Sequence, residues 1–80
     1  MQNENTEVTE IGGDVYLTTE ETANELRVSP RTLERLRQVG TGPAFCRLGR
    51  RVVYGRRQIR EYVASRTFTS TAEASLSARP

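Results

Sequence analysis

Arginine is the residue type of this sequence whose chemistry and placement are most informative. Residues 26 to 66 hold eleven arginines and two acidic residues, whereas residues 1 to 25 hold seven acidic residues and no base. A guanidinium group carries five donors in a planar fork that fits phosphate oxygens and the edge of guanine. A segment of net charge +9 that follows one of −7 is therefore typical of nucleic-acid binding, and the alternative is a solvated basic surface.

The other residue types argue against catalysis and against a metal site. Cys46 is the only cysteine, so neither an intramolecular disulfide nor a cysteine metal cluster can form. The sequence contains no histidine and no convergent carboxylates, and the common catalytic constellations need such groups. We therefore expect a protein that is not an enzyme and that uses no metal, cofactor or small-molecule ligand.

The two ends of the chain differ from its middle. Residues 1–14 are acidic and polar and predict a disordered leader, and residues 67–80 are rich in Ser, Thr and Ala and predict a flexible tail. The start of the chain lacks the pattern of a signal peptide, and no apolar run approaches transmembrane length. We expect a cytoplasmic protein without a membrane partner, with one domain over residues 15–66. The leader either improves solubility or competes with DNA for the arginine-rich surface.

Two helix starts lie close together in this domain. Thr18 and Glu21 form a capping box, which predicts a first helix with an apolar edge at Ala23 and Leu26. Ser29 and Pro30 are typical of an N-cap and a first helical residue, and they predict a second helix from Pro30 to about Val39, ended by Gly40. Only two residues separate the first helix from the second cap, which is helix-turn-helix spacing.

A β-hairpin and a third helix follow. Two short strand-like runs, residues 45–48 and 51–54, flank Gly49-Arg50, and glycine at the first central position suits a type II′ turn. In that register Phe45, Arg47, Val52 and Tyr54 share one face. Residues 56–66 then carry an apolar stripe at helical spacing. The aromatic residues are expected in the core, namely Tyr16, Phe45, Tyr54 and Tyr62.

The order helix, helix, hairpin, helix predicts an α+β, mainly α, fold, the small winged helix-turn-helix. Over about fifty residues the chain resembles the excisionase and MerR-like winged helix-turn-helix family. The resemblance rests on the order and spacing of Tyr16-Leu17-Thr18, Glu21, Ala23, Leu26, Val28-Ser29, Arg31-Thr32-Leu33, Gly42-Pro43, Phe45, Gly49-Arg50-Arg51-Val52, Tyr54 and Ile59. Arg27 stands where the family commonly has glycine, so we expect either a less tight turn between the helices or a strained backbone at Arg27.

The resemblance implies that the second helix enters the major groove of DNA and that the hairpin wing lies along the backbone or in the adjacent minor groove. Members are often excisionases of phages and integrative elements, also called recombination directionality factors, or short prophage regulators. The resemblance therefore implies a gene of bacterial, phage or other mobile-element origin.

Helical periodicity selects the candidate contact residues of the second helix. Leu33 and Leu36 should face the core, which leaves Arg31, Thr32, Glu34, Arg35 and Gln38 outward. Arg31 and Arg35 rank first as base readers, and phosphate contact is an equal alternative for each. Thr32 could instead act as a capping or buried hydroxyl.

Several further residues could contact the DNA backbone. Ser29 could offer its hydroxyl to a phosphate at the helix start as well as cap the helix. Arg37 should hold a phosphate or the Gly40–Pro43 loop. On the wing the candidates are Arg47, Arg50 and Arg51, for which charge that keeps the turn soluble is the alternative, and Arg56 and Arg57 rank after them.

Three functions fit these features. The first is an excisionase that loads head-to-tail and cooperatively on attachment-site DNA, bends it and directs an integrase toward excision. The absence of a dimerising coiled coil and of an effector domain from these 80 residues favours it over a ligand-sensing regulator. The second is a small transcriptional regulator of mobile-element genes, and the third is a protein-interaction module whose basic face binds an acidic partner.

Overall fold

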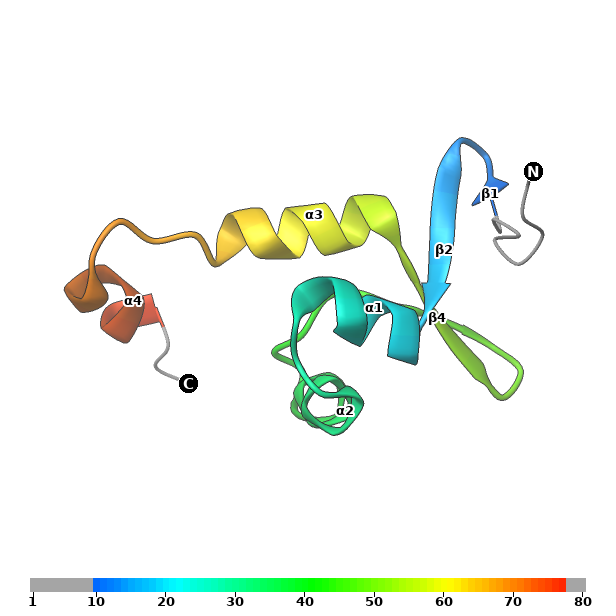
Figure 1. Cartoon of the computed structure of the whole chain (residues 1–80), viewed down its shortest axis with the longest axis horizontal. Helices are drawn as coiled ribbons and strands as arrows, with labels where there is room; N and C mark the ends of the chain where they lie inside the picture. The colour runs from blue at the N-terminus through cyan, green and yellow to red at the C-terminus, as the bar shows by residue number, and fades with distance from the viewer. Residues whose placement is uncertain (1–9, 78–80) are drawn as a thin grey trace.

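The computed structural model describes residues 10–77, which form four helices and four short strands (Figure 1). In chain order the elements are β1 (Glu10–Ile11), β2 (Asp14–Thr18), α1 (Thr19–Leu26), α2 (Pro30–Val39), β3 (Cys46–Leu48), β4 (Arg51–Gly55), α3 (Arg56–Ser65) and α4 (Thr71–Ser77). The predicted winged helix-turn-helix is confirmed, with a larger sheet than the sequence indicated.

The sheet is antiparallel with the strand order β1-β2-β4-β3. The predicted hairpin is β3 and β4, which pair Cys46 with Val53 and Arg47 with Val52. Gly49 has a φ of +63°, as the first central residue of a type II′ turn requires. Strand β2 was not predicted: it pairs Leu17 with Tyr54 of β4, so the wing continues a sheet that begins before the helices.

Local hydrogen bonds begin both helices of the helix-turn-helix where the sequence predicted. The Thr18 N–H donates to Glu21 Oε1 at 2.9 Å, and the Glu21 N–H donates to Thr18 Oγ1 at 3.1 Å. Ser29 Oγ accepts from the Thr32 N–H at 3.0 Å at the start of α2. Gly40 ends α2 with a φ of +79°. These caps occupy backbone groups that would otherwise lack partners at the helix ends.

The turn between α1 and α2 depends on Arg27. Its φ of 63° and ψ of 38° make it the one left-handed residue other than glycine within residues 10–77. The Arg27 N–H donates to the Asn24 carbonyl at 3.2 Å and the Val28 N–H to the Ala23 carbonyl at 3.0 Å, which is the Schellman pattern. The turn is as tight as glycine would make it, so the predicted strain at Arg27 is present.

A small core joins the sheet to the helices. It consists of Leu17, Ala23, Leu33, Tyr54 and Ile59, with Val15, Leu26 and Val52 partly buried against it. Among the four aromatic residues expected in the core, only Tyr54 is fully buried. Tyr16 and Tyr62 are half-buried, and Phe45 is 40% exposed because it lies before β3, beyond the edge of the core.

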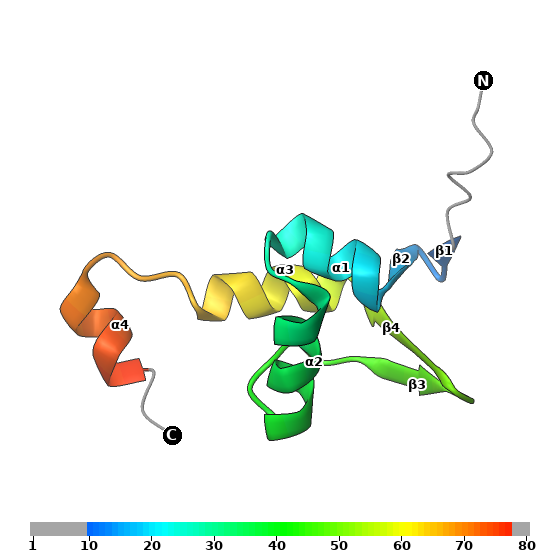
Figure 2. The ribbon, with the colours of Figure 1, turned by 60° about the horizontal axis from the view of Figure 1, so that its bottom comes forward.

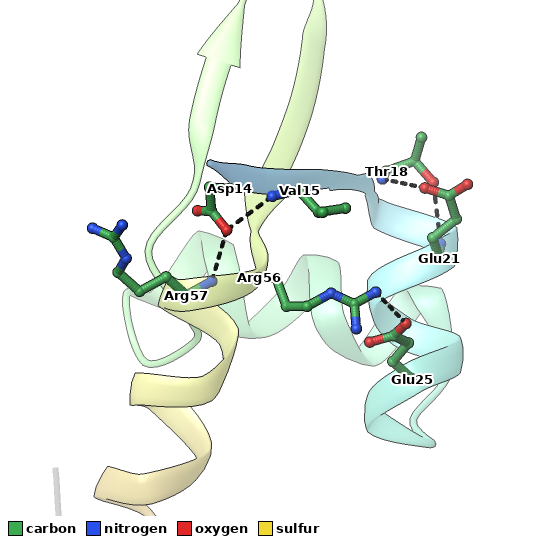
Figure 3. Close-up of polar contacts among 7 residues, drawn as sticks. All are labelled: Asp14, Val15, Thr18, Glu21, Glu25, Arg56 and Arg57. Atoms are coloured by element: carbon green, nitrogen blue, oxygen red, sulfur yellow. Dashed lines mark hydrogen bonds and ion pairs between the residues drawn. The ribbon is translucent and has the colours of Figure 1, made fainter. Parts of the chain in front are cut away.

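The N-terminus of α3 is capped by a side chain from another element. Gly55 precedes the helix and supplies no side-chain hydrogen bond. Asp14 of β2 does so instead: its Oδ1 accepts from the Arg57 N–H at 3.3 Å and from the Val15 N–H at 2.9 Å (Figure 3). A Cβ at residue 55 would lie 2.7 Å from Asp14 Oδ2. This contact therefore requires glycine at residue 55 and an acceptor at residue 14.

Both ends of the described chain contain secondary structure that the sequence did not indicate. Residues 10–14 form β1, a turn and the start of β2, so they belong to the sheet rather than to a leader, and residues 1–9 lie outside the described part. Within the predicted tail, residues 71–77 form α4, which lies apart from the other elements in both views (Figures 1 and 2). Ser70 followed by Glu73 three residues later is a capping sequence that could have indicated this helix. In the structure Ser70 Oγ accepts from the Glu73 N–H at 3.1 Å. Glu73 also accepts hydrogen bonds from Thr69. The bond from the Thr69 backbone N–H, followed in size by the bond from its hydroxyl, lowers the pKa of Glu73.

None of the helices within residues 10–77 is long and apolar enough to cross a membrane.

Replacing Arg27 tests the strain in the helix-turn-helix turn. Because a left-handed conformation costs a residue other than glycine about 1–2 kcal/mol, Arg27→Gly should raise the free energy of unfolding by about 1 kcal/mol. In a domain of this size that corresponds to roughly 4–8 °C in Tm, measurable by circular dichroism. Arg27→Ala is the control, since it removes the same charge and keeps the strain. Equal gains in both variants would show that charge, and not backbone conformation, is responsible.

Candidate nucleic-acid interface

Helix α2 presents a continuous polar face to solvent. Leu33 is fully buried and Leu36 is half-buried, and these residues turn the helix toward the core. All five residues that the sequence placed outward are exposed, namely Arg31, Thr32, Glu34, Arg35 and Gln38. In both ribbon views α2 and the tip of the β3–β4 hairpin lie on the side of the molecule away from α3 (Figures 1 and 2). Helix α2 and the tip of the wing therefore lie on the same side of the molecule.

The start of α2 is organised by two hydroxyl groups. Ser29 Oγ accepts from the Thr32 backbone N–H, and the Ser29 hydroxyl donates to Thr32 Oγ1 at 2.9 Å. Thr32 is exposed and its hydroxyl takes part in the cap, as the capping alternative anticipated, whereas a buried hydroxyl is ruled out. The pair fixes the first turn of α2, which carries Arg31 at the surface.

Arg37 occupies a different place from the one predicted. Its Nη1 donates to Tyr54 Oη at 2.9 Å and to Thr19 Oγ1 at 3.4 Å, and its guanidinium carbon lies 5.7 Å from the centre of the Phe45 ring. Within the described residues no hydrogen bond joins the Arg37 side chain to the Gly40–Pro43 loop, and the Thr41 carbonyl of that loop accepts from Arg66 Nη2 at 3.2 Å. Half-buried Arg37 connects α2 to α1 and β4, a contact that sequence reasoning missed because its partners are 17 and 18 residues away.

The wing carries three exposed arginines. Arg47 lies in β3 opposite Val52, Arg51 lies in β4 opposite Leu48, and Arg50 is in the turn between the strands. None of them belongs to the hydrophobic core, which the wing reaches only through Val52 and Tyr54. The hairpin is thus a thin extension whose outer part is cationic.

The two arginines that begin α3 have separate environments. Arg56 Nη2 forms an ion pair with Glu25 Oε2 of α1 at 2.9 Å, and each side chain is 40% exposed. Arg57 is exposed, and Figure 3 shows its side chain directed away from Arg56. The sequence suggested an external anion near this helix start, but Glu25 and Asp14 already provide negative charge there. Arg56 therefore links α3 to α1, whereas Arg57 extends from the helix start as an exposed side chain.

Tyr54→Phe tests the link between α2 and the wing. The substitution keeps the buried ring and removes the acceptor of the Arg37 hydrogen bond, so the free energy of unfolding should fall by about 2 kcal/mol, as for hydrogen bonds to charged groups. Tyr62→Phe is the control, because the Tyr62 hydroxyl makes no hydrogen bond within the described residues, and it should change stability by less than about 0.5 kcal/mol. Urea unfolding measures both, and equal losses would contradict the assignment.

Comparison with known proteins agrees with this architecture. A family model described as a helix-turn-helix domain matches residues 16–67, which include β2, both helices of the helix-turn-helix, the wing and α3. A search of curated proteins found no match. The matched family includes excisionase-like small helix-turn-helix proteins, and the resemblance to that type is confirmed. With most of its length matched and a winged helix-turn-helix observed, this DNA-binding chain belongs to the helix-turn-helix domain family.

Proposed function

We propose that the protein is an excisionase, or recombination directionality factor, that binds specific duplex DNA in several adjacent copies. The observation that supports this most directly is the shared side of the exposed α2 face and the cationic wing, in a family that includes excisionase-like proteins. In this proposal the protein shapes the attachment-site DNA on which a separate integrase acts.

Base recognition is assigned to the exposed face of α2. Arg31 and Arg35 lie one helical turn apart, and each can donate two hydrogen bonds to guanine O6 and N7. Gln38 can pair with adenine and Glu34 can accept from cytosine N4. Since Arg31 is in the first turn of α2 and the first residues of a recognition helix reach the bases most directly, it ranks ahead of Gln38.

Backbone contacts are assigned to the helix start and to the wing. Thr32 Oγ1 accepts from Ser29, so its own proton can be donated to a phosphate, close to the free N–H groups of α2. Arg47, Arg50 and Arg51 bind phosphates or the minor-groove edge, with exposed Arg57 as a further contact. Arg37 and Arg56 are omitted because Tyr54 and Glu25 already engage them.

Several copies on one DNA follow from the size of the interface. A single module of this kind buries roughly 600–1,000 Å² and reads few base pairs. Neighbouring copies on direct repeats raise the specificity through head-to-tail contacts. A small regulator of mobile-element genes would use the same surfaces, so the recombination reaction itself has to distinguish these two functions.

Three arginine variants test the assignment of α2 and the wing. Arg35→Ala should weaken binding to the cognate site about 10–100-fold and relax its sequence preference, because one bidentate base contact is lost. Arg50→Ala should weaken binding to all DNA sequences alike, and it should reduce the steepness of the plot of log K against log salt by about 1. Arg60→Ala is the charge-matched control, as an exposed arginine on α3. Fluorescence anisotropy at several salt concentrations measures these effects, and equal losses in all three variants would refute the assignment.

The excisionase role is tested on the attachment region of the element that encodes the protein. Footprinting locates the sites, and mobility shifts on one-site and multi-site fragments should show that occupied sites increase the affinity of their neighbours. With the integrase encoded beside it, the protein should stimulate excision and not integration. Repression of a promoter without an effect on excision would support the regulator instead. Absence of binding to any duplex at low salt would exclude both functions and favour a protein-interaction module.

A further inference from the structure

A leucine is exposed at the tip of the wing. Leu48 is the last residue of β3, next to the turn, and 60% of it is accessible to solvent. It belongs neither to the core nor to the partly buried residues packed against the core. The fold therefore does not use Leu48 for its own packing.

The surroundings of Leu48 are cationic. Leu48 pairs with Arg51 across the hairpin, so the two side chains emerge on the same face of the wing. Arg50 lies in the adjoining turn, and Arg47 precedes Leu48 on the opposite face. One exposed apolar residue is ordinary on a protein surface, but Leu48 shares the end of a thin hairpin with three exposed arginines. The positive charge of the wing tip favours a polyanion as the partner of this surface.

We propose that Leu48 is a wedge that enters the minor groove and inserts between two base pairs, and that it thereby kinks the duplex. The proposal rests on the DNA binding proposed above. Arg50 and Arg51 hold the phosphates beside the groove, and Leu48 replaces part of the stacking between the separated bases with apolar contact. Pyrimidine–purine steps unstack most easily, so the kink occurs at a TA or CA step under the wing. The insertion of Leu48 into the duplex requires neither a second copy of the protein nor an integrase.

Ile11 offers a matched control. It is 61% exposed and lies in β1, at the opposite edge of the same sheet. Ile11→Ala and Leu48→Ala thus each truncate one exposed apolar side chain on an outer strand. Circular dichroism of each variant verifies that its fold is retained.

The test uses the full chain and duplexes that carry one binding site, with 2-aminopurine placed at successive steps under the wing. The wild-type protein should raise the fluorescence at one step several-fold, and circular-permutation mobility shifts should show a bend at that step. Leu48→Ala should abolish the fluorescence rise and reduce the bend while weakening affinity less than tenfold. Ile11→Ala should behave as the wild type, and Arg50→Ala should lose affinity but retain the rise at saturation.

Two results would overturn the wedge while leaving DNA binding intact. In the first, wild-type protein binds the single site without a fluorescence rise at any step. In the second, Leu48→Ala unstacks and bends the single site as the wild type does and loses only cooperative loading on multi-site DNA, which would assign Leu48 to a contact with a second copy. If the wild type binds no duplex, the proposed function fails, and that outcome is distinct from both.

Discussion

Tyr54 is the residue on which the arrangement of helix and wing depends. Its ring is fully buried in the core, and its backbone pairs with Leu17 of β2 near the end of β4, the strand that also forms half of the wing. Its hydroxyl leaves the core and accepts a hydrogen bond from Arg37 of α2. One side chain thus connects the sheet, the wing and α2. A change in the position of this ring would alter the angle between the two surfaces proposed to contact DNA.

Such anchoring matters because the core is small. The hydrophobic core within residues 10–77 consists of five buried residues, and a domain of this size gains little stability from burial alone. Polar contacts between elements therefore add to the packing that positions the helices. Asp14 caps α3 from β2, and Glu25 pairs with Arg56 between α1 and α3. Both contacts cross between elements, so each fixes an angle that apolar contacts would leave less well defined.

Two groups of arginines in the central segment have different roles. Arg37, Arg56 and Arg66 donate to partners within the domain, namely Tyr54, Glu25 and the Thr41 carbonyl. The arginines of the exposed face of α2 and of the wing extend into solvent and are the ones assigned to DNA. The net positive charge of the segment indicated a nucleic acid as the partner. The hydrogen bonds within the domain then distinguish the arginines with internal partners from the arginines proposed to contact DNA.

Local signals in the chain were sufficient for much of this protein. The capping box at Thr18, the Ser29-Pro30 start, Gly40 and the Gly49 turn act within a few residues, so α1, α2 and the hairpin were predictable, as was the exposed set on α2. The tertiary structure alone decided the pairing of β2 with β4, the cap that Asp14 places on α3, and the inward position of Arg37. Each of these joins residues far apart in the sequence, and no local pattern of residues specifies a partner that only folding brings near.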